Sequence, residues 1–399
     1  MKRIPLSLLT SALLCHSAMA ADSITKAITS GTTSANLNLR YETVKQNNSV
    51  KDASALTLRT RIGYTTGTYK NFSAMLEMED SRIIGGQDEY TVGPTGFNPG
   101  TYSVIGDPEH TEVDQAFIKY SADGITTKLG RQVLTYDAHR FIGHVGWRQD
   151  RQTFDAFKFD YAVSKNLNMS YSYLYKRNRI FAEAADIDSK DSLLNVSYNT
   201  SLGKLVAYGY LLEKDNNTDN ALDTYGMSFN GKVDGVNKIK YKVEYATQSS
   251  KNGATDYDAN YLALEGSVVV SGITMKLGYE SLGSDKGAYG FSTPLATLHK
   301  FNGFADQFLT TPTVGLVDTY VTIATKLAVG KVVLTYHDFS ADESSATVDD
   351  LGSEIDFVYS KKLNKNYVVG VKYAAFSAGD TAAGKVDTDK LWLWGTLKF

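Results

Sequence analysis

The chain reads Lys238-Ile239-Lys240-Tyr241-Lys242-Val243-Glu244-Tyr245 along the segment that decides its fold. Charged and apolar side chains alternate at every position. Alternation with a period of two places one set on each face of a β-strand. Residues 56–62 and 167–173 repeat the pattern, with Leu, Met and Tyr opposite Arg, Asn and Ser. A strand with one apolar and one polar or charged face is typical of a membrane β-barrel that has lipid outside and water inside.

Runs of this kind continue along the whole chain. We count about 18, with 16 as the alternative, and an even number suits a single-chain barrel. Short turns such as 66–68, 122–124 and 201–203 alternate with longer polar stretches, of which the largest are 81–111 and 283–312. This rhythm predicts an all-β fold, a single antiparallel transmembrane β-barrel with short periplasmic turns and long extracellular loops. The strands are predicted to start near Ala35, Leu56, Phe72, Val113, Ile125, Gln152, Leu167, Asp191, Lys204, Asp223, Lys238, Tyr257, Ile273, Val317, Lys331, Ser353, Tyr367 and Asp389.

The two ends of the chain indicate export to the bacterial outer membrane. Residues 1–20 begin with Lys2 and Arg3, continue through an apolar stretch and end Ala18-Met19-Ala20, as a cleaved signal peptide does. The last strand, 389–399, ends in Phe399 with leucines in phase. This resembles the C-terminal signal that the barrel assembly machinery recognises. We therefore expect a signal peptide over 1–20 and one barrel over 21–399, embedded in outer-membrane lipid.

Composition excludes several other classes of protein. The only cysteine, Cys15, lies in the predicted signal, which rules out disulfides, thiolate metal sites and a cysteine nucleophile in the mature chain. Without Lys2 and Arg3, 39 basic residues face 44 acidic ones, so nucleic acid is not an expected partner. His139 and His144 are spaced poorly for a metal, and no known catalytic motif accompanies the histidines. We expect no catalytic residues, no metal and no cofactor.

The wet face of the predicted strands is richer in basic than in acidic residues, by roughly two to one. Such a lumen raises the local concentration of anions, which predicts an anion-preferring pore. The alternative is that these are ordinary solvated charges paired with acids. The basic residues assigned to this face are Arg40, Arg59, Arg61, Lys119, Lys128, Lys158, Lys176, Lys238, Lys240, Lys242, Lys276, Lys326 and Lys372.

Two loops have unusual compositions. Residues 139–151 combine glycine, aromatics and the arginines Arg140, Arg148 and Arg151, which suits a segment folded back into the pore, where guanidinium groups meet carboxylates. A surface loop is the alternative. Residues 291–306 are too apolar for a solvated loop. We expect them to pack against the barrel wall or to plug part of the mouth.

Several motifs resemble the alginate export family of outer-membrane porins. They are Leu129-Gly130-Arg131-Gln132, residues 140–143 with 145–149, Gln152-Thr153-Phe154-Asp155-Ala156, residues 293–297 with 299–303 and residues 388–394. The resemblance implies an 18-stranded monomeric barrel with an arginine-rich, anion-selective lumen. By its motifs it also implies that Arg131, Arg140, Arg148 and Arg151 are pore or constriction groups.

The leading hypothesis is thus diffusion of small anionic or sugar-like solutes, such as alginate or other oligosaccharides, through a basic lumen without covalent chemistry. One alternative is a general porin with little selectivity. Another is a barrel that acts as a surface receptor, adhesin or enzyme through its loops.

Overall fold

The computed structural model describes residues 21–93, 96–235 and 238–399, so the predicted signal peptide, residues 1–20, lies outside the described residues. Eighteen strands of the described chain form one sheet. They are β1 (Thr32–Gln46), β2 (Ala53–Thr65), β3 (Phe72–Glu89), β4 (His110–Ala122), β5 (Ile125–Gln132), β6 (Thr153–Ala162), β7 (Leu167–Asn178), β8 (Ile187–Asn199), β9 (Gly203–Glu213), β10 (Asn220–Val233), β11 (Lys238–Asn252), β12 (Thr255–Val270), β13 (Ile273–Leu282), β16 (Leu316–Leu327), β17 (Gly330–Ser340), β18 (Asp350–Lys362), β19 (Tyr367–Ser377) and β20 (Thr388–Lys398).

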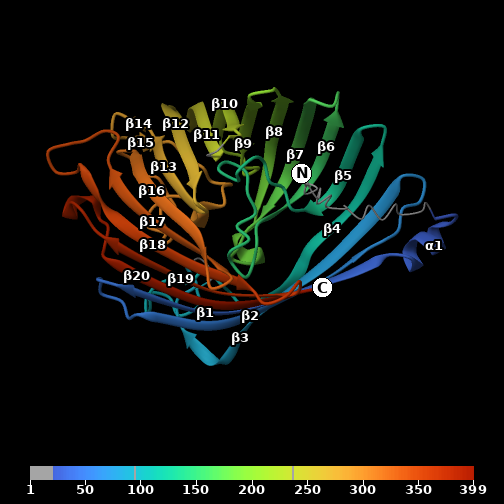
Figure 1. The fold of residues 1–399 in the computed structure, drawn as a ribbon, viewed down its shortest axis with the longest axis horizontal. Coiled ribbons are helices and arrows are strands. Elements are labelled where there is room, and N and C mark those ends of the chain that lie inside the picture. The colour runs from blue at the N-terminus through green and yellow to red at the C-terminus, as the bar shows by residue number, and fades with distance from the viewer. Residues whose placement is uncertain (1–20, 94–95, 236–237) are drawn as a thin grey trace, which may run out of the picture.

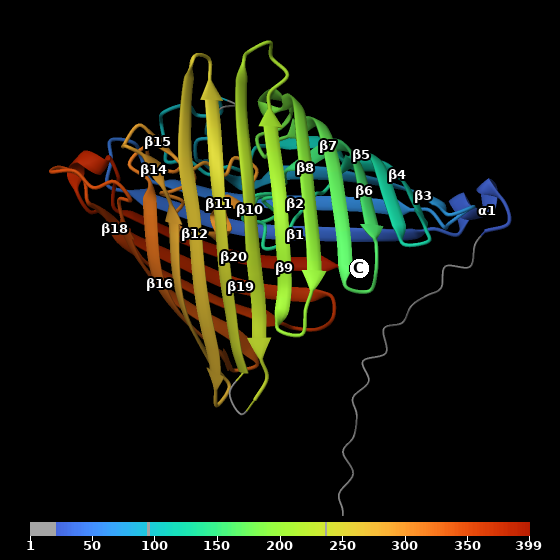
Figure 2. The same cartoon turned by 90° about the horizontal axis from the view of Figure 1, so that it is seen from above.

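The sheet closes on itself. Each strand pairs antiparallel with the next one along the chain, and β20 pairs with β1, with Trp394 opposite Arg40. Figures 1 and 2 show the strands side by side in a sheet that curves round the molecule. A closed sheet leaves no free edge, which a membrane-spanning sheet requires. The predicted 18-stranded antiparallel barrel is confirmed.

The predicted strand starts agree with the structure, and the largest difference is at β8, which begins at Ile187 rather than at Asp191. The predicted outer loop 81–111 is too long, because β3 continues to Glu89. Gly85 and Gly86 have φ values of 66° and 68°, so the strand bends there. Paired glycines resemble turn chemistry in sequence, which explains why this part of β3 was predicted to be loop.

Alternation along the strands separates an apolar outer face from a polar inner one. Ile62, Leu129 and Leu277 point outward and are about 60% exposed, at 60%, 57% and 60%. Their neighbours in the opposite phase, such as Arg61 and Lys128, face the interior. Within the described ranges, no helix is long and apolar enough to cross a bilayer.

Both ends of the described chain lie at the end of the barrel that carries the short turns. The short helix α1 (Ile24–Thr29) begins after Ser23, whose side chain accepts a hydrogen bond from the Lys26 amide. Ala35 and Phe399 exchange backbone hydrogen bonds of 2.8 and 3.0 Å, which ties the start of β1 to the chain end. Figure 1 shows α1 projecting beyond the strands on this side.

Two long connections fill part of the interior. Residues 133–152 join β5 to β6, and residues 283–315 join β13 to β16 and include the small hairpin of β14 (Ser284–Asp285) and β15 (Tyr289–Gly290) and the 3-10 turn Leu298–Lys300. Further 3-10 turns lie at Glu183–Ala185 and Thr381–Ala383. Ile142, Phe291 and Leu295 are almost fully buried in one apolar cluster with the inner wall. The prediction that 291–306 pack against the wall is therefore confirmed.

Candidate functional site

The connection 133–152, here called the constriction loop, crosses the barrel interior and is fixed there by its arginines. Arg140 donates to both carboxylate oxygens of Glu280 on β13, with Nε–Oε1 and Nη2–Oε2 distances of 2.7 and 3.3 Å. Its Nη2 also donates to Asn302 Oδ1 at 3.2 Å. Arg140 therefore joins the loop to the wall and to the connection 283–315.

Arg148 anchors the other half of the loop. Its Nη1 lies 3.0 Å from both oxygens of Glu42 on β1, and its Nη2 lies 3.2 Å from Asp306 Oδ2. Although burial alone lowers the pKa of Arg148, the carboxylates of Glu42, Asp107 and Asp306 raise it above its usual value, so the group stays charged. Next to it, Arg40 of β1 binds Asp107 and the backbone oxygen of Trp147.

A third set of contacts holds the end of the loop. Arg151 Nε donates to Asp114 Oδ1 at 3.1 Å, and its Nη2 contacts Glu77. Arg61 binds Glu79. Arg59 donates to Asn36 Oδ1 at 2.9 Å and to the Arg148 carbonyl at 3.4 Å, and among the described residues it has no ion pair.

The predicted arginines are thus mostly engaged with carboxylates rather than free. Arg40, Arg59, Arg61, Arg140 and Arg148 are 1%, 5%, 6%, 3% and 7% exposed. The prediction that residues 139–151 fold into the pore and meet carboxylates agrees with this geometry. Because most of these arginines are buried and paired with carboxylates, their main role is to hold the constriction loop in place inside the barrel.

Arg131 does not face the lumen, which corrects the expectation from the motif. It follows Gly130 in β5 and is in phase with Leu129, which is 57% exposed on the outer face. It pairs with Asp155 of β6, with a Nε–Oδ1 distance of 2.8 Å.

Lys176 also lies on the outer face, because it stands opposite Asp155 in the β6–β7 register. One bulge at Tyr175 in β7 shifts the alternation, which is why sequence placed Lys176 inside.

An aromatic cage surrounds Lys372, a residue that the sequence placed on the wet face but did not single out. Its Nζ lies 3.6 Å from the Trp147 ring centre and 3.9 Å from that of Phe304. His299 Nε2 lies 3.0 Å from the same Nζ. Burial lowers the pKa of His299 to about 3, so its imidazole is neutral. It can then donate from Nδ1 to Asp306 Oδ1, 2.7 Å away, and accept at Nε2.

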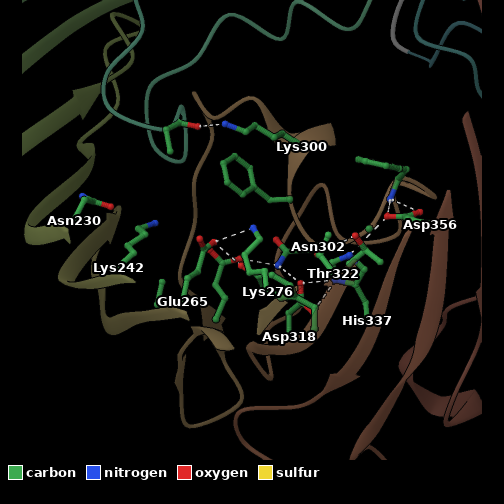
Figure 3. A pocket seen from close by; sticks show the side chains of 18 residues that line it. Asn230, Lys242, Glu265, Lys276, Lys300, Asn302, Asp318, Thr322, His337 and Asp356 are labelled. Atoms are coloured by element: carbon green, nitrogen blue, oxygen red, sulfur yellow. Dashed lines mark hydrogen bonds and ion pairs between the residues drawn. The ribbon is translucent and has the colours of Figure 1, made fainter. Parts of the chain in front are cut away.

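Four adjoining cavities of about 310, 310, 420 and 490 Å³ lie around residues 136–139 of the constriction loop. We call them the turn-side basin, because Lys204 and Ala162, next to short turns, line them. Figure 3 shows one of these cavities, where Lys242, Lys276 and Lys300 surround the space together with several acids. Polar side chains of this kind can hydrate or bind a polar solute.

The acids of the turn-side basin all have partners. Among the residues that line it, Asp137, Asp160, Glu244 and Glu280 form ion pairs with Lys204, Lys158, Lys242 and Arg140. Glu265 pairs with Lys276, while Asp318 and Asp356 lie beside His337. Lys300 instead donates to the Ala138 carbonyl, at 2.7 Å. Lys300 is therefore a cation of the turn-side basin that has no acidic partner among the described residues.

The remaining predicted lysines lie on the inner face. Lys119, Lys128 and Lys158 stand opposite one another on β4, β5 and β6. Lys238, Lys240 and Lys242 share one phase of β11, and the first two are exposed near the short-turn end. Within the described ranges, Lys119, Lys128, Lys238 and Lys240 make no ion pair.

Comparison with known proteins agrees with this geometry. The family model described as alginate export matches residues 29–290, well over half of the chain. The chain belongs to the alginate export family. Among curated proteins, none matches it significantly. The family match covers β1 to β15 and includes the constriction loop.

Solved structures with the same fold are outer-membrane proteins of this architecture. Acinetobacter baumannii OccAB4 has a TM-score of 0.74 at 12% identity, and the alignment covers 92% of this chain and 98% of that one. Pseudomonas aeruginosa OpdK with vanillate has a TM-score of 0.73 at 11% identity, with 93% and 99% covered. A. baumannii OccAB1 has 0.69 at 14% identity, with 94% and 98% covered. At such identities the likeness shows the fold alone.

This member of the alginate export family is an outer-membrane β-barrel channel for small solutes. Lipid contacts its apolar outer face, and solute passes through its interior. Of the arginines in the family-like motifs, Arg140, Arg148 and Arg151 bind the constriction loop to the barrel wall, whereas Arg131, within the described chain, makes no contact of this kind and pairs with Asp155. The pairing of Arg140 with Glu280, and of Arg148 with Glu42, Asp107 and Asp306, could not be found from sequence, because more than 30 residues separate the partners in each pair.

Proposed function

We propose that this channel conducts small anions, including carboxylate-bearing sugars, in preference to cations, and that lysines rather than arginines contact the solute. The observation that carries the proposal is the difference in pairing. The loop arginines Arg140, Arg148 and Arg151 form ion pairs, while Lys119, Lys128, Lys238 and Lys240 have no acidic partner among the described residues. A fixed positive charge that nothing neutralises attracts mobile anions.

The row of Lys119, Lys128 and Lys158 supports the same proposal. Like charges directly opposite each other on neighbouring strands destabilise a sheet. Asp160 accepts hydrogen bonds from Lys158 Nζ at 2.5 and 2.6 Å, which offsets the charge of Lys158. Lys119 and Lys128 have no acidic partner of this kind among the described residues. Anions bound beside these lysines would offset the repulsion between them. OpdK is recorded with vanillate, itself a carboxylate, which fits an anionic solute for this chain as well.

Selectivity can be measured as the reversal potential of single channels in a planar bilayer under a KCl gradient. We expect the wild type to prefer chloride and the double variant Lys119→Gln/Lys128→Gln to move the reversal potential toward zero. Lys251→Gln is the matched control, because Lys251 is exposed at the far end of β11 and pairs with Asp219. Cation preference in the wild type, or equal shifts in both variants, would contradict the proposal.

Solute class is tested by replacing chloride with glucuronate on one side. A measurable glucuronate current that falls in the double variant is expected. A channel that treats glucuronate and a neutral sugar of similar size alike would instead be a general porin.

The proposal includes the maturation of the chain and its lack of catalysis. Residues 1–20 are removed on export, residues 21–399 form the single barrel domain, and the assembly machinery binds the strand that ends in Phe399. Phe399 is 70% exposed, which leaves it accessible to a partner. Mass spectrometry of protein from outer membranes should find Ala21 as the first residue, and Phe399→Ser should reduce the amount of folded barrel.

A further inference from the structure

Four side chains with metal-binding atoms meet beside the end of the constriction loop. Glu79 comes from β3, His110 and Glu112 come from the start of β4, and Asp150 comes from the loop. Each offers one ligand atom, and these atoms all lie within 4.8 Å of one another. Three separate parts of the chain thus converge on one point, close to the long-loop end of the barrel.

The orientation of His110 suits a metal ligand. Its Nδ1 lies 3.2 Å from the Pro108 carbonyl oxygen, which can accept a hydrogen from Nδ1. Without a metal, Nε2 donates to Glu79 Oε1; with a metal bound, Nε2 would lose that hydrogen and present its lone pair to the ion. Nε2 lies 3.2 Å from Glu79 Oε1 and 3.9 Å from Asp150 Oδ2. Two ligands of a tetrahedral Zn²⁺ site lie roughly 3.3 Å apart, for bonds of about 2.0–2.1 Å.

Charge gives an independent reason to expect a cation. Glu79 and Glu112 stand directly opposite each other in the β3–β4 register. Arg61 binds one oxygen of Glu79, at Oε2, and leaves Oε1 toward His110. Carboxylates this close repel each other unless a positive ion lies between them.

Asp150 provides the second, separate observation. Its side chain is 0% exposed. Oδ2 accepts a hydrogen bond from the Ala182 amide at 3.1 Å, but Oδ1 is buried without any hydrogen-bond partner among the described residues. An orphaned carboxylate oxygen in the protein interior is costly, and coordination of a metal removes that cost.

From these observations we propose that Glu79, His110, Glu112 and Asp150 bind one divalent transition metal ion of the Zn²⁺ type. An imidazole nitrogen among carboxylates favours such a metal over Ca²⁺ or Mg²⁺, which take oxygen ligands. A cavity of about 750 Å³, lined by His110, Glu112 and Ala182, gives the ion a way in. The metal fixes Asp150, and with it the end of the constriction loop, to β3 and β4.

The test uses the mature barrel, refolded in detergent, stripped with a chelator and then titrated with Zn²⁺. We expect one tight Zn²⁺ per chain by calorimetry, confirmed by elemental analysis after desalting, and a higher unfolding temperature with Zn²⁺ bound. His110→Ala and Asp150→Asn should each weaken binding by more than about tenfold, since loss of even an outer-shell partner costs about 10–100-fold. Asp150→Asn nearly preserves shape, and the heat-dependent gel mobility of folded barrels checks that each variant folds.

His144→Ala is the matched control. His144 lies in the same loop, and its ring centre is 5.2 Å from that of His139, which makes this pair the competing place for Zn²⁺. The control should retain full Zn²⁺ affinity. Loss of binding in His144→Ala, unchanged binding in both His110→Ala and Asp150→Asn, tighter binding of Ca²⁺ than of Zn²⁺, or no binding to the wild type would each overturn the proposal. Ion selectivity does not enter this test, so the channel proposal stands or falls separately.

Discussion

Arg140 and Glu280 form a bidentate ion pair inside the barrel, although 140 residues separate them in the chain. Both side chains are buried, at 3% and 7% exposure. Tyr261 and Asn302 donate to the same carboxylate, at 2.6 and 2.7 Å. The four groups therefore lock the constriction loop, the wall and the connection 283–315 to one another. Loop position in this channel depends on a satisfied polar network rather than on apolar packing alone.

Arg140→Gln should loosen the constriction loop. Removing one partner of a buried pair leaves Glu280 without its counter-charge, which typically costs about 3–5 kcal/mol of unfolding free energy. Urea unfolding of the refolded barrel measures this loss, and single-channel recordings should show a noisier current. Arg82→Gln is the control, because the Arg82–Asp80 pair is exposed and should contribute less than about 1 kcal/mol. Equal losses in the two variants would contradict the assigned role.

Arg131→Gln should leave ion selectivity unchanged. Although the motif suggested a pore residue, Arg131 lies on the outer face with Asp155, three residues from the inward Lys128. We expect a reversal potential in a KCl gradient like that of the wild type, whereas Lys128→Gln should shift it. A shift with Arg131→Gln that matches the Lys128→Gln shift would show that the outward placement is wrong.

The sequence predicted the barrel well because alternation and turn spacing are local signals. Each run of alternating residues predicts one strand without information from the rest of the chain. An even number of strands, each paired with the next, then closes simply into an antiparallel barrel. Lumen residues such as Lys119 and Lys240 follow from the same parity. The inward or outward assignment of side chains was wrong after a bulge, because one extra residue reverses the alternation, as Tyr175 does before Lys176.

The site was less predictable because its partners are distant in sequence. The composition of residues 139–151 indicated a loop inside the pore, but nothing near Arg148 points to Glu42 or Asp306. The cluster of Glu79, His110, Glu112 and Asp150 was missed for the same reason, since only folding brings loop and strands together. His139 and His144 are near each other in sequence but spaced poorly for a metal, so no metal site was expected.

Acid should weaken the packing around His299. Burial lowers the pKa of His299 to about 3, against about 6.5 in an unfolded chain, so between these values the unfolded state binds more protons. This contribution to stability is therefore complete above pH 6.5 and decreases as the pH falls toward 3. Asp306, Lys372 and Arg148 carry the charges that face the ring.

Tryptophan fluorescence during urea unfolding at pH 7, 5 and 4 measures this effect, since Trp147 stacks on His299 at 5.3 Å. His299→Gln should lessen the dependence on pH, because glutamine can donate and accept without titrating. His139→Gln is the control at a less buried histidine and should retain most of the dependence. An unchanged dependence in His299→Gln would assign the acid sensitivity to other groups.

Gly303→Ala should destabilise the connection 283–315. Gly303 has a φ of 85°, and a Cβ there would lie 2.2 Å from Glu354 Oε2. The backbone conformation alone costs a non-glycine residue about 1 kcal/mol, and the clash adds to it. Glu354 cannot move freely, because its Oε1 accepts a hydrogen bond from the Ala305 amide at 2.7 Å. We therefore expect Gly303→Ala to lose more unfolding free energy than the strained backbone conformation alone would cost.

Gly384→Ala separates the two contributions. Gly384 also has a positive φ, 68°, but a Cβ there meets nothing within 4 Å. The unfolding free energy of Gly384→Ala should fall only by the conformational cost. In the same urea titration, the unfolding free energy of Gly303→Ala should fall clearly more. A double variant, Gly303→Ala/Glu354→Ala, removes the clashing carboxylate and should recover part of the difference. If Gly303→Ala and Gly384→Ala lose equal stability, Glu354 does not confine the loop at this position.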